Sequence, residues 1–297
     1  MSLKNVLKHQ IENRWNIGFI EDGISSVLSG QECHIKWVKN CCQDRWFADP
    51  FILSVNADLI ELLVEEFSYE RRIGRIAKLV ISRPDYKLLS YKIILEQDTH
   101  LSFPFIFRYQ GHIYVLPENS QSGKSTLYEY FPESESLKRI NVIADEPLTD
   151  ATILDYDGAY YVLSTQLPNP NGNILTVCHL DTEKMKCGDK VCEIMFENNA
   201  ARNAGEVLFY NNRLVRPMQD CSKCYGGGVI LREFNPHSRS QQNMKVMSTL
   251  YPKSYRYNQG LHTFNTFDDL IVVDGRGFFN PFWGRIINRV FEISRKK

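Results

Sequence analysis

The sequence has no long apolar run, no apolar leader and no excess of charge of either sign. No stretch approaches the roughly 18 consecutive apolar residues that a transmembrane helix needs. The N-terminal MSLKNVLKHQIENRW lacks the apolar core of a signal peptide. Lys plus Arg equals Asp plus Glu at 35 each, and the resulting net charge of zero argues against nucleic acid as a partner. We therefore expect a cytoplasmic protein without a membrane span.

Cysteine is too sparse to form a disulfide scaffold, with 8 in 297 residues. Cys221 and Cys224 form a CxxC pair, and Cys41 and Cys42 are adjacent. A structural zinc site would need a second CxxC or a nearby pair of histidines. We therefore predict reduced thiols that pack as small apolar side chains, and no metal.

Signatures of nucleotide cofactors are also lacking. The glycines at 226–228 lie in no strand-then-helix unit, so they are not a dinucleotide fingerprint. Gly123-Lys-Ser125 looks like the end of a phosphate-binding loop, but Glu118 stands where the first glycine of that loop should be. The sequence therefore predicts no cofactor.

Helical periodicity is scarce, whereas short runs typical of β-strands dominate the chain. Residues 2–14 could form a short amphipathic helix, and little later in the chain sustains a 3.6-residue period. Runs rich in β-branched and aromatic residues alternate with polar turns, as at 58–65, 111–116 and 158–163. These patterns indicate an all-β protein.

The strand patterns recur as a strand-turn-strand unit about every fifty residues. The units start at 49, 102, 150, 204 and 262, and polar or glycine turns join their two strands as hairpins. A period near fifty is typical of the blades of a β-propeller. A two-sheet sandwich also repeats strands, but it gives no reason for the same polar-then-apolar unit to open each repeat.

We therefore predict one five-bladed β-propeller over residues 1–297. Its blades should start near 46, 100, 148, 202 and 260, and residues 1–45 should hold an N-terminal segment. Residues 15–20 and 34–38 within that segment should supply the strand that closes the ring.

The start of each innermost strand should face one end of the central channel. The polar residues found there are therefore expected to converge on a ligand, and they are Asp49, His100 with Ser102, Asp150, Arg202 and His262. A second polar stretch offers bidentate donors and hydroxyl acceptors for a sugar or phosphate, in Arg216, Gln219, Asp220 and Tyr225. Salt bridges between blades would use the same residue types, and this alternative stays open.

Glycoside chemistry needs two carboxyl groups, one as acid and one as base or nucleophile. Asp49 is the first candidate for the base, and Asp150 is a candidate for a carboxylate that tunes a neighbour. The acid could be Glu118 or Glu206. The alternative for Asp49 is that an Asp before Pro only shapes a turn.

Ala48-Asp49-Pro50, Asp150 and the five-fold repeat resemble the five-bladed superfamily of glycoside hydrolase family 43, arabinanases, levansucrases and invertases. The resemblance implies Asp49 as general base, Asp150 as pKa modulator and Glu206 as the acid.

Several short pieces between about 45 and 280 are similar to the N-terminal domain of plant glucosamine inositolphosphorylceramide transferases and its bacterial stand-alone relatives. They are His100-Leu-Ser-Phe-Pro104, Pro117-Glu118, Asp150, Ala204-Gly205, Arg216-Pro-Met-Gln-Asp-Cys221 and Tyr225-Gly226. The plant proteins join this domain to a glycosyltransferase domain, so the resemblance implies a separate partner glycosyltransferase here.

These features lead to two hypotheses from different classes. The first is a glycan-active protein that cleaves or transfers a sugar unit in surface-polysaccharide or glycolipid biosynthesis. The second is a non-catalytic module that binds a carbohydrate, sugar phosphate or nucleotide sugar for a partner glycosyltransferase. Carboxyl groups paired across the channel would favour the first hypothesis.

Overall fold

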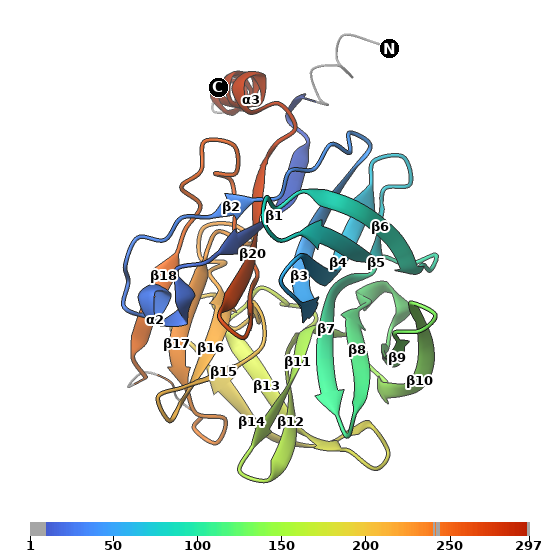
Figure 1. Cartoon of the computed structure of the whole chain (residues 1–297). Helices are drawn as coiled ribbons and strands as arrows, with labels where there is room; N and C mark the ends of the chain where they lie inside the picture. The colour runs from blue at the N-terminus through green and yellow to red at the C-terminus, as the bar shows by residue number, and fades with distance from the viewer. Residues whose placement is uncertain (1–9, 240, 242–243, 296–297) are drawn as a thin grey trace.

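The structure is a computed structural model that describes residues 10–239, 241 and 244–295. Five four-stranded antiparallel sheets surround a common centre as the blades of a propeller (Figure 1). Within the described residues, the other regular elements are two α-helices and one short 3₁₀ helix, η1 (Ser120–Ser122). The predicted all-β, five-bladed fold is confirmed.

The blades follow one another along the chain, each running from its innermost to its outermost strand. Blade I comprises β3 (Arg45–Val55), β4 (Leu59–Ser68), β5 (Ile73–Ser82) and β6 (Leu88–Leu95). Blade II comprises β7 (Ser102–Tyr109), β8 (His112–Glu118), β9 (Ser125–Phe131) and β10 (Ser136–Ala144). Blade III comprises β11 (Leu148–Tyr156), β12 (Ala159–Gln166), β13 (Ile174–Asp181) and β14 (Lys186–Met195). Blade IV comprises β15 (Leu208–Tyr210), β16 (Arg213–Gln219), β17 (Val229–Phe234) and β18 (Val246–Leu250).

Blade V is shared between the two ends of the chain. Its inner strands are β19 (Phe264–Phe267) and β20 (Leu270–Phe278), and its outer strands are β1 (Asn13–Ile20) and β2 (Lys36–Trp37). All eight residues of β1 pair with β20, so backbone hydrogen bonds close the ring. The predicted ring-closing residues at 15–20 lie in β1. The prediction of a helix over residues 2–14 is wrong at its C-terminal end, because Asn13 and Arg14 pair with β20 and belong to β1. Residues 2–9 of that predicted helix lie outside the described residues.

The hairpin turns have the backbone conformation that their sequences predict. Gln110-Gly111, Asp157-Gly158 and Asn211-Asn212 each place two successive residues at positive φ, between 48° and 82°. This conformation matches the right-handed twist of the flanking strands, and it favours Gly, Asn and Asp. The turns therefore set the register of the two inner strands in blades II, III and IV.

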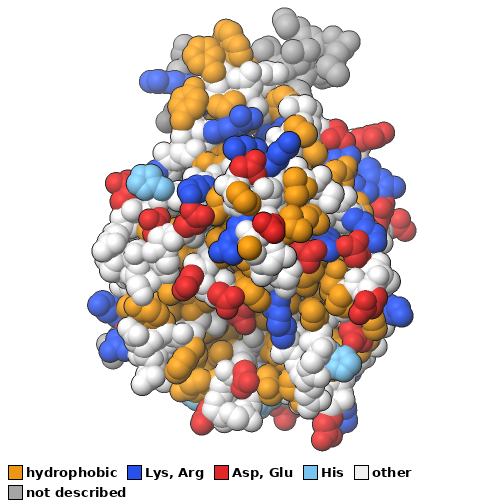
Figure 2. Space-filling model, in the orientation of Figure 1, with side chains coloured by type: hydrophobic (Ala, Val, Ile, Leu, Met, Phe, Trp, Pro, Cys, Tyr) orange, Lys and Arg blue, Asp and Glu red, His pale blue; other side chains and the backbone are white. Residues whose placement is uncertain are grey.

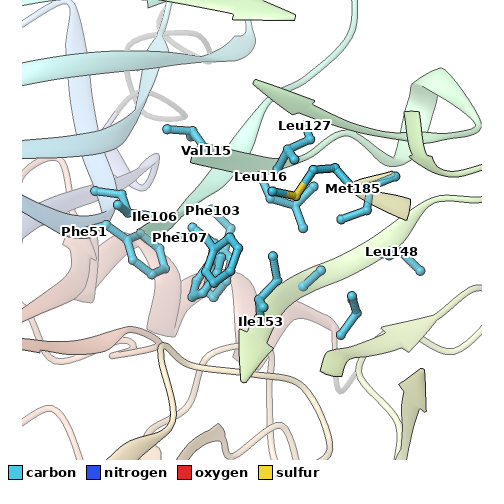
Figure 3. Close-up of a cluster of buried hydrophobic side chains, with 14 of the residues drawn as sticks. Phe51, Phe103, Ile106, Phe107, Val115, Leu116, Leu127, Leu148, Ile153 and Met185 are labelled. Carbon is cyan, nitrogen blue, oxygen red and sulfur yellow. The ribbon is translucent and has the colours of Figure 1, made fainter. Parts of the chain in front are cut away.

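The apolar core lies between neighbouring blades. A cluster of buried side chains joins blades I, II and III, including Phe51, Phe103, Ile106, Leu116 and Ile153 (Figure 3). Each large side chain of this kind contributes roughly 1.5–3 kcal/mol when it is fully buried. The apolar side chains of the inner strands therefore pack in layers between the blades, whereas polar residues lie at the starts of these strands.

The two α-helices lie outside the five sheets. Helix α2 (Gly23–Leu28) connects β1 to β2 and buries Val27 and Leu28. Helix α3 (Pro281–Arg295) follows β20 and stands beyond the end of blade V (Figure 1). Among the described residues, no helix is both long enough and apolar enough to cross a bilayer.

Candidate functional site

The innermost strands of blades I, II and III share a backbone irregularity near their starts. Pairing with the second strand slips between Ala48 and Phe51, between Ser102 and Phe105, and between Thr149 and Thr152. One residue within each slip has positive φ: Asp49 at 51°, Phe103 at 44° and Asp150 at 42°. Such bulges redirect side chains, and Asp tolerates positive φ better than most residues. The repeat therefore aims Asp49 and Asp150 in equivalent ways.

A carboxylate of the preceding blade accepts a hydrogen bond from the amide of each bulged residue. Asp274 Oδ2 accepts from the Asp49 amide at 3.2 Å, and Asp49 Oδ2 accepts from the Phe103 amide at 3.1 Å. Glu118 Oε2 accepts from the Asp150 amide at 3.1 Å. These bonds tie blade V to I, I to II and II to III. They bring acidic groups of successive blades into what we call the channel-mouth cluster: Asp49, Glu118, Asp150, Arg202, Gln219, Tyr225, His262 and Asp274.

One half of this cluster is organised by Arg202. The Arg202 guanidinium binds both carboxylate oxygens of Asp150, with Nε to Oδ2 at 2.6 Å and Nη2 to Oδ1 at 3.2 Å. The same Nη2 donates to Glu118 Oε2 at 3.1 Å, so the two acidic groups share one guanidinium nitrogen. Gln219 Nε2 donates to Asp150 Oδ2 at 2.6 Å. Asp150 is thus a fixed, fully engaged acceptor.

The other half of the cluster surrounds His262. Its Nδ1 lies 2.6 Å from Asp274 Oδ2 and 3.7 Å from Asp49 Oδ1. Asp274 Oδ1 also accepts from the backbone amides of His262 and Thr263 at 2.9 and 3.1 Å. The imidazole ring stacks on Trp15 with ring centroids 4.0 Å apart. A fixed imidazole therefore separates two carboxyl groups.

Tyr225 connects the two halves at the surface. Its ring lies edge-on to His262 with ring centroids 5.3 Å apart, and the Arg202 guanidinium carbon sits 5.0 Å from the Tyr225 ring centroid. The residue is 38% exposed, whereas Asp49 and Asp150 are only 4% and 2% exposed. A ligand that approaches this end would therefore meet Tyr225 first and the carboxyl groups beneath it.

Burial and neighbouring charges shift the ionisation of this cluster. Burial raises the pKa of Glu118 to about 8; Arg202 opposes the rise, and the negative charge of Asp150 adds to it. Burial raises the pKa of Asp49 well above its usual range, although His262 opposes the rise. Burial alone would lower the pKa of His262, but Asp274 and Asp49 outweigh it and raise the pKa to about 9. At neutral pH, Glu118 and His262 therefore both carry a proton.

The protonation of His262 predicts that stability falls in mildly alkaline solution. Its pKa is 6.5 ordinarily and about 9 in the fold, so the folded protein holds this proton more tightly than the unfolded chain. The resulting stabilisation is complete below pH 6.5 and is lost as pH rises through 9, a change of about 3 kcal/mol. Glu118, raised from 4.5 to about 8, contributes a decline of the same sign at lower pH.

Urea unfolding followed between pH 6 and about 9.5 measures this decline. We expect His262→Gln to remove most of the slope that remains near pH 9, where Glu118 is about nine-tenths ionised. The exposed His34 provides a matched control, and His34→Gln should keep the slope. An equally steep decline in His262→Gln would contradict the assignment.

Asp49, His262 and Asp274 also form the one group of described residues whose ligand atoms could surround a metal ion. One ligand atom from each lies within 4.8 Å of the others, and all three residues are buried. Both Asp274 oxygens already accept backbone amides, so a cation would have to share them. Carboxylate oxygens and one imidazole nitrogen are a donor set for a small divalent ion.

The structure places the other predicted site residues at different depths. His100 Nε2 lies 3.1 Å from Glu65 Oε1. Ser102 is the backbone pairing partner of Glu118 between strands β7 and β8 of blade II. Asp220 accepts from the Tyr251 hydroxyl at 2.8 Å, outside the channel-mouth cluster.

Glu206 and Arg216 lie apart from the cluster. Burial raises the pKa of Glu206 to about 7 against the opposing charge of Arg108, and Glu206 lines a cavity of about 450 Å³ with Asp155 and Phe209. Arg216 is completely buried, where it donates to Asn203 Oδ1 at 2.9 Å and to the Ala201 carbonyl. Arg216 therefore holds the residues on both sides of Arg202 in place through its bonds to Ala201 and Asn203.

Sequence reasoning missed Asp274 and Trp15. A usable signal existed, since Glu118 and Gln219 end the second strands of their blades and Asp274 directly follows the apolar run at 270–273 in β20. A polar residue at that repeated position predicts a place at the channel mouth. Trp15 carried no such signal, because its strand joins blade V only through ring closure.

A sizeable cavity lies away from the channel-mouth cluster. It measures about 810 Å³ and is bounded by the segment 30–37 and strand β18, at the outer edges of blades V and IV. None of the channel-mouth residues lines it. The location of the carboxyl groups, rather than cavity size, therefore defines the candidate site.

Fold and site together define a five-bladed propeller with a buried cluster of acidic groups, Arg and His at one end of its channel. The chain belongs to the family described as glucosamine inositolphosphorylceramide transferase 1, N-terminal, which it matches over residues 33–258. It is 33% identical over 207 residues to glucosamine inositolphosphorylceramide transferase 1 of Arabidopsis thaliana, covering 66% of this chain and 26% of that protein. The enzyme of the same name from Oryza sativa subsp. japonica is 28% identical over 194 residues, covering 62% and 25%. The chain thus spans about a quarter of the length of these relatives.

Solved structures confirm the fold. A GH43_1 enzyme from Xanthomonas citri complexed with xylotriose matches 80% of this chain and 88% of its own, with a TM-score of 0.53 and 11% identity. The exo-β-1,3-galactanase 1,3Gal43A from Clostridium thermocellum matches 72% and 50%, with a TM-score of 0.51 and 10% identity. At this identity the likeness concerns the fold alone.

Proposed function

We propose that the channel-mouth cluster binds a sugar and cleaves or transfers its glycosidic bond, with Glu118 as general acid and Asp49 as base. The observation that carries the proposal is the state of Glu118. The two donors to this carboxyl group, the Asp150 amide and Arg202, both bind Oε2. Glu118 retains a proton at neutral pH, because burial and a hydrogen bond with the Asp150 carboxylate raise its pKa to about 8. A general acid needs a proton of this kind beside the leaving oxygen.

Asp49 is suited to the complementary role. Its Oδ2 is held by the Phe103 amide, whereas Oδ1 lies 3.7 Å from the His262 imidazole. Its raised pKa makes the ionised form a stronger proton acceptor. Asp150, bound by Arg202 and Gln219, would fix the position of Glu118 and raise its pKa.

The substrate class follows from the donors around the cluster and from the family. Tyr225 offers an exposed ring for stacking on a sugar face, and Arg202 and His262, each paired with a carboxylate of the cluster, place positive charge beneath it. The relatives are named glucosamine inositolphosphorylceramide transferase 1. We therefore place this activity in the biosynthesis of a glycolipid or surface polysaccharide, in the cytoplasm, beside a partner glycosyltransferase.

A second function is favoured by one specific observation. Both oxygens of Asp150 are occupied by Arg202 and Gln219, and Asp49 is almost completely buried. Carboxylates whose hydrogen bonds are all satisfied within the protein make a site rigid, which also suits a protein that only binds its ligand. In this alternative the propeller holds a carbohydrate or nucleotide sugar for the glycosyltransferase and performs no chemistry.

A screen of nucleotide sugars, sugar phosphates and oligosaccharides separates these functions. A ligand at 100 times its Kd should stabilise the protein by about 2.7 kcal/mol, visible as a higher Tm. Each stabilising compound is then incubated with the protein and analysed by mass spectrometry. If Glu118 is the acid, product formation should decline as pH rises through about 8. Binding without product at any pH would favour the binding module, and no stabilisation by any sugar would contradict both.

A further inference from the structure

Helix α3 exposes large apolar side chains at one end of the molecule. Phe282 is 57% exposed, Trp283 is 53% exposed and Ile286 is 44% exposed. Residues three and four apart share one side of a helix, so these three form a continuous stripe. Tyr255, 64% exposed, lies beside the helix, with the Arg285 guanidinium carbon 4.1 Å from its ring centroid. We call Tyr255, Phe282, Trp283 and Ile286 the α3 patch.

The fold fixes which face of α3 points outward. Asn280 caps the helix, since its Oδ1 accepts from the amides of Phe282 and Trp283 at 3.1 Å each. A Cβ placed on Gly284 would come within 2.5 Å of the Phe278 side chain and 2.8 Å of the Gln10 carbonyl, so the glycine face packs against the body. Turning the helix to bury the α3 patch would break this close approach.

Basic residues accompany this apolar stripe. Between residues 281 and 290, helix α3 contains Arg285 and Arg289 and no acidic residue, although the whole chain is neutral. Arg289 is exposed on the turn after Ile286. Figure 2 shows apolar side chains gathered at the top of the molecule with Lys and Arg side chains beside them.

We propose that α3 and the α3 patch bind the surface of an anionic lipid bilayer. Trp, Tyr and Phe combined with Arg match a membrane interface, where rings enter the acyl boundary and cations meet lipid phosphates. At 15 residues, or about 22 Å, α3 is suited to lie in the plane of the interface.

This surface is connected to the channel-mouth cluster. Helix α3 continues directly from β20, which carries Asp274 and, two residues on, Arg276. Arg276 in turn donates to the Tyr225 and Gln259 carbonyls at 3.3 and 2.8 Å. Bilayer binding would therefore hold the end of blade V that contributes to the cluster toward the lipid surface. The binding itself does not depend on the proposed function.

Co-sedimentation with vesicles tests the proposal. Wild-type protein is mixed with phosphatidylcholine vesicles that contain phosphatidylserine at a ratio of about 3:1, and with phosphatidylcholine alone. We expect sedimentation with the anionic vesicles, weaker binding to the neutral ones, and loss of the difference near 1 M salt, where the Debye length is about 3 Å.

Two variants separate the apolar and ionic contributions. Phe282→Ser/Trp283→Ser should weaken binding more than about tenfold, because two exposed rings lose their contact with the acyl boundary. Arg289→Gln should weaken binding to anionic vesicles about fivefold and leave neutral vesicles unaffected. Phe209→Ser at 72% exposure and Lys184→Gln, both outside α3, are the matched controls and should bind like the wild type.

Three results would overturn the proposal. The first is an absence of sedimentation with anionic vesicles, and the second is equal binding by the Phe282→Ser/Trp283→Ser variant. The third is a dimer in gel filtration that this variant dissociates, which would show that a second copy covers the α3 patch. An unchanged Tm of the variants would establish that they fold, because the replaced side chains are exposed.

Discussion

Replacing Asp49 with asparagine is expected to lower turnover by about 10²- to 10⁴-fold while leaving sugar binding intact. The substitution removes the charge and the proton-accepting ability of the side chain but little else. Asparagine adopts the φ of 51° found at this position as readily as aspartate does, and its amide oxygen can still accept from the Phe103 amide. The fold and the bond between blades I and II should therefore persist.

The measurement is product formation with any compound that raises the Tm, together with the Kd of that compound. Asp157→Asn is a matched control, since Asp157 also has positive φ, 53°, but is exposed on the β11–β12 turn. Turnover by Asp49→Asn at the wild-type rate would remove Asp49 from the reaction. Loss of binding together with turnover would instead show that Asp49 holds the sugar.

The largest effect on stability is expected from Asp150→Asn. The substitution leaves the Arg202 guanidinium, whose side chain is 10% exposed, without its bidentate carboxylate. Breaking a buried ion pair by removing one partner costs about 3–5 kcal/mol, because the remaining charge stays desolvated. For a protein of this size the loss corresponds to a decrease in Tm of about 10 °C.

A double-mutant cycle tests this explanation. Asp150→Asn/Arg202→Met removes both charges, so it should be more stable than the sum of the single changes predicts. Asp181→Asn breaks the exposed pair with Lys184 and should change the Tm far less than Asp150→Asn does. Additive single changes at Asp150 and Arg202 would show that the pair is not coupled.

The carboxylates of the cluster differ in how many of their oxygens are used in hydrogen bonds that hold the fold together. Asp150 and Asp274 use both oxygens in hydrogen bonds within and between blades. Asp49 and Glu118 each devote one oxygen to a bulged amide of the next blade. The same residues that join the blades can thus present their second oxygen to a ligand. This division explains why Asp49 and Glu118, rather than Asp150, are the proposed acid–base pair.

Much of the candidate site followed from the repeat alone. Asp49 and Asp150 occupy equivalent bulges, and Arg202 and His262 precede the innermost strands of their blades. Sequence position therefore predicted their convergence. The roles of Arg216 and Glu206 could not be predicted in this way, because a local pattern does not show whether a side chain faces the channel mouth or the protein interior.

The sequence by itself determined the fold, because strand alternation and turn chemistry are local properties. Turns such as Gln110-Gly111 impose a hairpin wherever two apolar strands flank them, and five such units with a common period give five blades. The tertiary structure alone decided which atoms meet. Asp274 reaches the Asp49 amide across 225 residues, and Arg202 reaches Glu118 across 84. The first contact exists because ring closure through β1 brings blade V against blade I, and the second exists because the blades meet around one channel. Burial at these contacts then sets the ionisation of the groups.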